Sequence, residues 1–250
     1  MQTPSPLPAL LGHNDLMRQL QLRSRLDAAA LREKPAEPAP ELRGMLTSAN
    51  AGHHERISAA VAPASQEPLE SLLRRRASTR TYAPQPISVD VLTAVVERAA
   101  AFDRTAWPDH DGGAGLEFLV AARHVTGLPT GMHLYSPTGG DFVRLADLPA
   151  GDAAEELVLQ LEFAHAPAII IVCGPLAASL DRHGEHGHRL LLARAGAAAH
   201  TAWLTALDRG LAGSIFAGFL SSALKPLVPV DGYRSAQLLA FSCGHPAAAE

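Results

Sequence analysis

The sequence predicts an α+β fold with a central, mostly antiparallel sheet flanked by helices. Strand-like and helical segments follow one another without the strict alternation that produces a parallel sheet. Hydrophobic residues make up 47% of the 250 residues and charged residues only 18%, so we expect a large buried core. No glycine-rich nucleotide fingerprint follows a strand, which argues against a Rossmann or P-loop domain.

Residues 1–65 differ in composition from the rest. We expect them to form a partly helical, linker-like extension ahead of one domain at residues 66–250. Leucines at helical spacing predict an amphipathic helix over residues 14–31, with Asn14 as its N-cap. Two stretches rich in Pro, Ala and Ser follow, as is typical of linkers.

From residue 66 onward, hydrophobic periodicity predicts a mixture of helices and strands. The predicted helices span residues 66–76, 88–102, 152–163, 188–211 and 221–227. The predicted strands span residues 116–123, 131–135, 142–145, 168–173 and 237–243, with a hairpin joining the second to the third. Small residues from Ala195 to Ala199 suit close helix packing, either within the chain or across a dimer axis.

Bulk properties exclude several classes of function. A net charge of -4 and a pI near 6.3 give no electrostatic basis for nucleic-acid binding. The sequence shows no signal peptide and no apolar run long enough to span a membrane, so we expect a cytoplasmic protein. Cys173 and Cys243 each end an apolar run and are expected to be buried thiols on strands, without a disulfide.

The stretch Leu72 to Tyr82 (LLRRRASTRTY) concentrates groups that can bind an anion. It contains four arginines and two hydroxyl side chains, namely Arg74, Arg75, Arg76, Arg80, Ser78 and Thr79. Guanidinium forks and hydroxyls hold phosphate well. Arginines also complement the dipole at a helix C-terminus, so a basic helix end is the competing interpretation.

The ordered set of motifs resembles the nitroreductase-like family of FMN flavoproteins over residues 66–246. The family's Arg-x-Ser-x-Arg phosphate motif with a following aromatic residue matches Arg76, Ser78, Arg80 and Tyr82. Its later glycine motifs match Gly210-Leu211-Ala212-Gly213, Gly218-Phe219 and Gly244-His245-Pro246. The resemblance implies a nitroreductase-like fold, FMN as the cofactor, and a homodimer with flavin at the subunit interface.

A narrower resemblance lies in the segment HVTGLPTGMHLYSPTGGDFVRL. It is similar to the hairpin of the SagB-type azoline dehydrogenases, through Gly127, Leu128, Gly131, Leu134, Tyr135 and Pro137. That branch implies oxidation of thiazoline or oxazoline rings to azoles in a ribosomal precursor peptide, beside a cyclodehydratase that makes the azolines. Peptide-antibiotic biosynthesis is the expected setting.

The proposed cofactor-binding residues are Arg76, Ser78, Arg80, Gly213, Ser214, Gly218 and Phe219. Two guanidiniums and a hydroxyl would hold the FMN phosphate. The second group is expected to form a glycine-bearing turn after the long helix, where backbone N–H groups could approach the flavin ring. A helix C-cap and a loop are the structural alternative for those glycines.

The catalytic segment departs from the family pattern. A Lys-Tyr pair usually precedes the long helix, and the aligned residues here are Arg182 and His183, in a frame kept by Gly184, Gly187 and Arg189. A base must take a ring proton during azoline oxidation. Arg182 stays protonated, whereas the imidazole of His183 can accept a proton. Tyr135 and Tyr233 are further candidates, and His183 without a catalytic role is the structural alternative.

Other readings compete with the azoline dehydrogenase. His183, His186 and His188 could bind zinc, although the family implies no metal. Asp109, His110 and Asp111 could act in acid-base chemistry. Hydrolysis by a Ser-His-Asp triad is less favoured, because the sequence contains no nucleophile-elbow motif. A general NAD(P)H-dependent nitro or quinone reductase is one alternative function. A non-catalytic flavin-fold subunit of a peptide-modifying complex is the other.

Overall fold

The computed structural model describes residues 13–25, 46, 55–65, 67–108 and 115–247. Within these ranges, seven strands form one sheet in the order β1-β6-β5-β3-β7-β9-β8, and every neighbouring pair is antiparallel. The strands are β1 (Arg56–Ser58), β3 (Glu117–Ala122), β5 (Gly131–Ser136), β6 (Asp141–Ala146), β7 (Ala168–Gly174), β8 (Ala212–Phe216) and β9 (Ala236–Gly244). The predicted α+β class with an antiparallel central sheet is confirmed.

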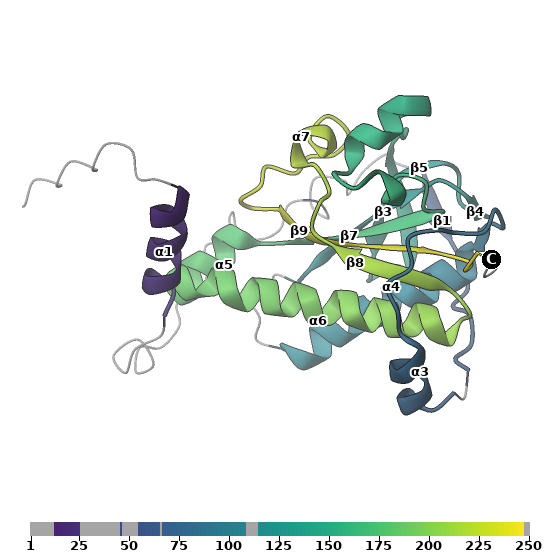
Figure 1. Ribbon diagram of the computed structural model, residues 1–250, viewed down its shortest axis with the longest axis horizontal. Coiled ribbons are helices and arrows are strands. Elements are labelled where there is room, and N and C mark those ends of the chain that lie inside the picture. The colour runs from purple at the N-terminus through teal and green to yellow at the C-terminus, as the bar shows by residue number, and fades with distance from the viewer. Residues whose placement is uncertain (1–12, 26–45, 47–54, 66, 109–114, 248–250) are drawn as a thin grey trace, which may run out of the picture.

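Helices cover both faces of this sheet (Figure 1). One face carries α4 (Val89–Ala106) and α6 (Gly187–Asp208), and the other carries the 3-10 helices η4 (Gly151–Leu157) and η5 (Leu161–Phe163) with α7 (Ser221–Leu224). Each face has its own apolar cluster of buried side chains. The other elements are α1 (His13–Arg23), α3 (Leu69–Arg75), α5 (Leu176–His183), η6 (Gly184–His186) and the short parallel pair β2 (Ile87–Ser88) and β4 (Val125–Thr126).

α4 forms where the sequence predicts it. The Ser88 side chain caps the helix by accepting a hydrogen bond from the Asp90 N–H. Leu92, Val95, Val96 and Ala99 are all buried, at the spacing of one helix face. The helix therefore packs its apolar face on the sheet and against α6.

A buried ion pair joins α4 to α6. The Arg194 guanidinium donates to both carboxylate oxygens of Asp103 at 3.1 and 3.0 Å. Both side chains are almost fully enclosed, with 3% and 2% exposed. Asp103 also accepts the Leu116 N–H at 3.0 Å, so one carboxylate ties α4, α6 and the approach to β3 together.

Residues 151–163 depart from the predicted α-helix. They form η4 and η5, with Val158 in extended conformation between them. Val158 makes a β-bridge with Phe219, and the Leu159 N–H donates to the Gly218 carbonyl at 2.6 Å. Pairing with this distant segment uses backbone groups that a continuous helix would need for itself.

The N-terminal region also differs from prediction. α1 begins at His13, so Asn14 lies inside the helix rather than capping it, and residues 26–31 of the predicted helix lie outside the described residues. β1 lies in the predicted linker, yet it pairs with β6 through Arg56, Ile57 and Ser58. The sheet therefore takes one edge strand from the extension.

The patch of small residues in α6 divides between two environments. Ala195, Ala198 and Ala199 are fully buried in the cluster beneath α4 and α6. Gly196 differs, because a methyl group there would meet open space. Packing within the chain therefore explains the buried alanines, whereas no described residue would lie within 4 Å of a methyl group at Gly196.

Two further expectations concern the cysteines and membranes. Cys173 on β7 and Cys243 on β9 are both buried free thiols, as predicted. Burial raises the pKa of Cys243 to about 12, so this thiol stays protonated and unreactive. No described helix is both long and apolar enough to cross a bilayer.

Arg194→Met should lower the free energy of unfolding by about 3–5 kcal/mol, because it leaves the Asp103 carboxylate buried without its counter-charge. Urea unfolding would measure this loss. Arg74→Met is the matched control, since Arg74 pairs with Glu70 on the surface and should contribute no more than about 0.5 kcal/mol. Equal losses in the two variants would contradict the importance of the buried pair.

His133 on β5 should make stability fall below neutral pH. It is fully buried, its Nε2 lies 2.9 Å from the Pro129 carbonyl, and burial lowers the pKa of this imidazole. The unfolded chain takes up a proton near pH ~6.5 while the folded chain does not, so stability decreases as the pH falls through that value.

Urea unfolding at pH 7.5 and 5.5 should show a loss of about 1 kcal/mol that His133→Gln removes. His165→Gln is the control, because His165 lies on the surface beside Glu155. An unchanged pH dependence in His133→Gln would refute the assignment.

Candidate cofactor site at the edge of the sheet

The segment after α3 continues the sheet beyond β8. Ser78 forms a parallel β-bridge with Gly213, and the Thr79 N–H donates to the Gly213 carbonyl at 3.0 Å. Four residues after Ser78, Tyr82 bridges Pro246, and the Ala83 N–H donates to the His245 carbonyl at 2.9 Å. The predicted phosphate motif therefore has a fixed backbone path along the β8–β9 edge.

Tyr82 fastens this segment from within. Its hydroxyl lies 2.9 Å from the Thr79 carbonyl oxygen, to which it donates, and 2.7 Å from Ser242 Oγ on β9. Burial raises the pKa of Tyr82 well above its usual value, so the phenol keeps its proton at neutral pH. Tyr82 therefore holds the segment that carries the motif against β9.

Two of the four arginines are used in holding α3. Arg74 pairs with Glu70 at 2.6 Å, one turn earlier on the helix. Arg75 forms a fork with the Glu67 carboxylate at 3.0 and 2.7 Å, and also donates to the Leu207 carbonyl of α6 at 2.7 Å. The bond to Arg75 lowers the pKa of Glu67. Both guanidiniums therefore already have carboxylate partners.

Arg76 and Arg80 are placed differently. The Arg76 Cζ lies 4.5 Å from the centroid of the Trp203 ring, and Arg76 has no ion-pair partner among the described residues. The Arg80 Cζ lies 6.0 Å from the Phe163 ring, with Glu162 at 3.4 Å. Ser78 is exposed between them. Two guanidiniums and one hydroxyl at the surface can together hold a doubly charged phosphate.

Gly213 and Ser214 lie on a strand, and the predicted glycine-bearing turn is absent there. Both belong to β8 and pair with β9. A Cβ on Gly213 would come within 2.2 Å of the Ser242 carbonyl oxygen and 2.7 Å of the Phe241 ring, so close packing explains this glycine. The strand was missed because it is short and contains a glycine.

Gly218 and Phe219 lie beyond the end of β8. Phe219 is buried in the apolar cluster under η4 and η5, and its backbone bridges Val158. A Cβ on Gly218 would lie 3.1 Å from that of Leu159. The structure therefore gives Phe219 a place in the core.

Arg182 and His183 end a helix rather than lying in the predicted loop. They occupy the last turn of α5, which stops at Gly184 with a φ of 58°. Gly187 then starts α6 so close to α5 that a Cβ would lie 2.1 Å from the Ser179 carbonyl oxygen. These two glycines thus form the tight corner between α5 and α6.

The corner binds α1 from the N-terminal extension. Arg189 donates to Ser24 Oγ at 2.6 Å and to the Gln21 carbonyl at 2.8 Å, and His186 Nδ1 lies 2.9 Å from the Ser24 carbonyl oxygen. Arg23 forms an ion pair with Glu185. Arg189, a residue of the family frame, therefore anchors a helix in this chain.

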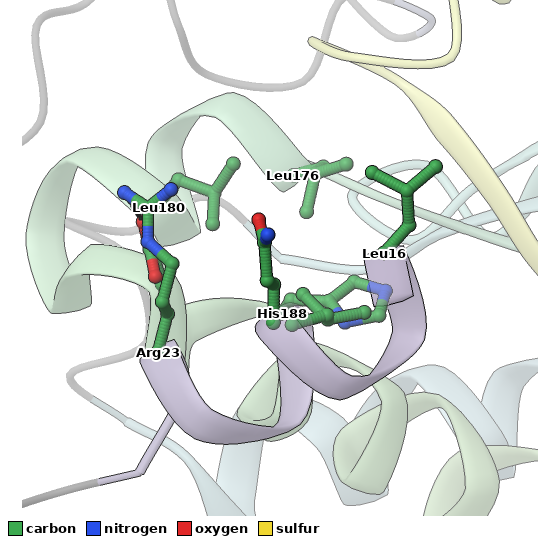
Figure 2. Close-up of a pocket in the computed structure, with 8 residues that line it drawn as sticks. Leu16, Arg23, Leu176, Leu180 and His188 are labelled. Carbon is green, nitrogen blue, oxygen red and sulfur yellow. Dashed lines mark ion pairs between the residues drawn. The ribbon is translucent and has the colours of Figure 1, made fainter. Parts of the chain in front are cut away.

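An open cavity of about 410 Å³ lies between α1, α5 and the start of α6. Figure 2 shows Leu16 of α1 with Leu176 and Leu180 of α5 around it, and His188 and Arg23 beside them. His183, the residue predicted to move a proton, does not line this cavity.

The predicted site residues occupy three separate places in one chain. α1 and α5 lie at one end of α6, and α3 lies at the other (Figure 1). Trp203 is sixteen positions after Gly187 on α6, which is roughly 24 Å along the helix axis. Arg182 and His183 precede α6 at the Gly187 end, whereas Arg76 lies over Trp203. The structure does not bring the predicted catalytic pair to the phosphate motif within a single chain.

Tyr135 is separate from both. Three strands lie between β5 and β8, a distance of roughly 19 Å. The side chain is buried against Phe142, and its hydroxyl has no hydrogen-bond partner among the described residues. Burial raises the pKa of Tyr135 to about 12, which disfavours proton transfer at neutral pH. Tyr233 is exposed in the loop before β9.

Two other candidate groups concern a metal site and an acid-base group. Among residues 13–25, 46, 55–65, 67–108 and 115–247, no three His, Cys, Asp or Glu side chains gather to hold a metal ion. The Asp109, His110 and Asp111 group lies outside the described residues.

Comparison with known proteins identifies the fold and the family. The profile of the Nitroreductase family matches residues 73–245, from the arginine stretch to the end of β9. The chain belongs to the nitroreductase family. A nitroreductase-family protein of Methanocaldococcus jannaschii is 25% identical over 170 residues, which cover 66% of this chain and 86% of that protein.

Solved nitroreductase structures share this fold at low sequence identity. One from Anabaena variabilis has a TM-score of 0.74 at 18% identity and covers 98% of this chain, which spans only half of that protein. One from Desulfovibrio desulfuricans, in complex with FMN, has a TM-score of 0.50 at 19% identity, covering 74% and 89% of the two chains. A chain of the E. coli microcin synthetase McbBCD complex, with truncated pro-MccB17 bound, has a TM-score of 0.53 at 14% identity, covering 93% and 92%.

Proposed function

We propose that this nitroreductase-family chain is an FMN-dependent oxidoreductase whose FMN phosphate binds at Arg76, Ser78 and Arg80. The observation that carries the proposal is the pair of guanidiniums beside Ser78, at the surface of the β8 edge. Arg76 has no ion-pair partner in the described part of the chain, and Arg80 has only the longer contact to Glu162. The FMN complex of the Desulfovibrio nitroreductase supports the choice of flavin.

The residues present fit such a phosphate. Two guanidiniums balance its two negative charges, and the Ser78 hydroxyl adds a donor between them. The backbone of the segment is fixed by β8 and by Tyr82, so little ordering is needed when the ligand binds. Arg74 and Arg75 are occupied by Glu70 and Glu67 and contribute less.

We further propose that the substrate is an azoline ring in a ribosomally made precursor peptide. Support comes from the β5–β6 hairpin, which carries the segment similar to azoline dehydrogenases, and from the likeness in fold to a chain of the microcin synthetase complex. Gly127 of that segment has a φ of 88° and lies against Val89, a position that needs glycine. A cyclodehydratase that makes the azoline is the expected partner.

Oxidation of an azoline to an azole removes a hydride and a proton from the ring. Bound FMN supplies the hydride acceptor. His183 is our candidate for taking the proton, because Arg182 beside it stays protonated. His183 lies at the end of α6 opposite Trp203 and Arg76, so we propose that it acts at the flavin bound by a second copy of the chain. A homodimer is therefore part of the proposal.

A non-catalytic flavin-fold subunit is the second candidate. Three observations favour it. Arg182 and His183 lie at the opposite end of α6 from Arg76, Tyr135 is buried, and α1 packs on the corner that follows His183. A general nitro or quinone reductase differs from both candidates, because it would turn over NAD(P)H with nitroaromatics without a peptide.

Removing the two phosphate arginines should release flavin. We expect Arg76→Ala with Arg80→Ala to weaken FMN binding by roughly 100-fold or more, at 1.5–3 kcal/mol for each charged hydrogen-bonding group. Fluorescence titration with FMN would measure the change. Arg74→Ala is the matched control from the same stretch and should bind as the unmodified chain does. Equal losses in both variants would place the phosphate elsewhere.

An azoline-containing precursor peptide tests the reaction. Incubation with the FMN-loaded protein and an oxidant should remove two hydrogens per ring, seen by mass spectrometry. His183→Ala should slow this loss by roughly 10²–10⁴-fold if the imidazole is the base. Full activity in the double variant Arg182→Ala, His183→Ala would refute that assignment. Flavin binding without turnover would instead favour the non-catalytic subunit.

A further inference from the structure

Each of the two proposed phosphate arginines lies over an aromatic ring from a different face of the sheet. Arg76 lies over Trp203 of α6, which belongs to the cluster under α4 and α6. Arg80 lies over Phe163 of η5, which belongs to the cluster on the opposite face. The short segment between them therefore crosses the edge of the sheet at β8.

We propose that Trp203 and Phe163 are positioning residues, which seat Arg76 and Arg80 for the phosphate of the cofactor. The proposal rests on the FMN site proposed above and adds two residues that the sequence motif does not contain. Neither ring would touch the phosphate itself. Each acts through the guanidinium that lies over it.

The geometry of a guanidinium allows this arrangement. Its hydrogen-bond donors point outward in the plane of the group, whereas a ring contacts its flat face. A ring therefore holds the arginine by cation–π attraction while the donor edge stays available. A carboxylate partner would occupy that same donor edge and so compete with phosphate. Glu67 occupies the donor edge of Arg75 in this way.

Both rings are held firmly in the core. Trp203 is only 5% exposed and packs beside Phe241 with the ring centroids 6.2 Å apart. Phe163 stacks on Phe216 at 4.2 Å with an interplanar angle of 16°. The Trp203 indole N–H is buried and has no hydrogen-bond partner among the described residues. The indole therefore contacts Arg76 through its aromatic face and not through its N–H group.

The two contacts between a guanidinium and a ring differ in distance and therefore in expected strength. Arg76 is 4.5 Å from its ring and Arg80 is 6.0 Å from its own, so Trp203 should matter more than Phe163. Arg80 also contacts Glu162 at 3.4 Å. That carboxylate competes with an incoming phosphate, so removing its charge should strengthen binding.

Dissociation constants for FMN and for riboflavin, which lacks the phosphate, would test the proposal on the full chain. We expect Trp203→Leu to weaken FMN binding roughly three- to thirtyfold and to leave riboflavin binding unchanged. Trp203→Phe should fall between that variant and the original. Phe163→Leu should cost less, roughly two- to fivefold. Glu162→Gln should tighten FMN binding by up to roughly fivefold, again without an effect on riboflavin.

The outcomes separate this proposal from the function on which it rests. Suppose that the chain prefers FMN over riboflavin and that Trp203→Leu leaves this preference intact. The positioning role of the aromatic rings would then be refuted, and the phosphate site would stand. Equal weakening of FMN and riboflavin would show that Trp203 only supports the fold. If the original chain shows no preference for FMN, both the phosphate site and the positioning role of Trp203 and Phe163 are refuted. Should Trp203→Leu not fold, as judged by urea unfolding, Trp203→Phe and Glu162→Gln decide the matter.

Discussion

The buried ion pair between Arg194 and Asp103 fixes the helical layer on which the proposed cofactor site depends. It joins α6 to α4, and the bond from Leu116 to Asp103 adds the approach to β3. Enclosure of both charges makes the pair intolerant of the loss of either partner. Further along α6, Trp203 lies under Arg76 and the Leu207 carbonyl accepts from Arg75. The arginine segment is thus held by α6 as well as by β8.

Residues shared with the family sequence pattern have structural tasks in this chain. Gly184 and Gly187 make the corner between α5 and α6, and Arg189 holds α1. The frame around Arg182 and His183 is explained by these contacts without any reference to catalysis. Arg76 and Arg80 differ from these residues: each contacts an aromatic ring through the flat face of its guanidinium, and Arg76 has no carboxylate partner among the described residues. This contrast makes the cofactor proposal stronger than the assignment of the proton acceptor.

Sequence periodicity located those elements whose own residues determine them. α4, α6, β3, β5, β6, β7 and β9 form near their predicted positions, because an amphipathic helix or a continuous apolar strand is a local pattern. The sequence predicts a helix over residues 152–163, but pairing of Val158 with Phe219 interrupts it. β1 and β8 were missed because they are short edge strands, which depend on the neighbours that complete their hydrogen bonds.

The sequence by itself determined the α+β class and the identity of the proposed phosphate residues, because Arg76, Ser78 and Arg80 lie within one short motif. Only the tertiary structure decided that Arg74 and Arg75 pair with Glu70 and Glu67, and that Trp203 and Phe163 lie beneath Arg76 and Arg80. It also decided that Arg182 and His183 lie at the far end of α6. Local patterns encode dihedral preference and amphipathic faces, whereas contacts between residues a hundred positions apart depend on strand order and helix packing.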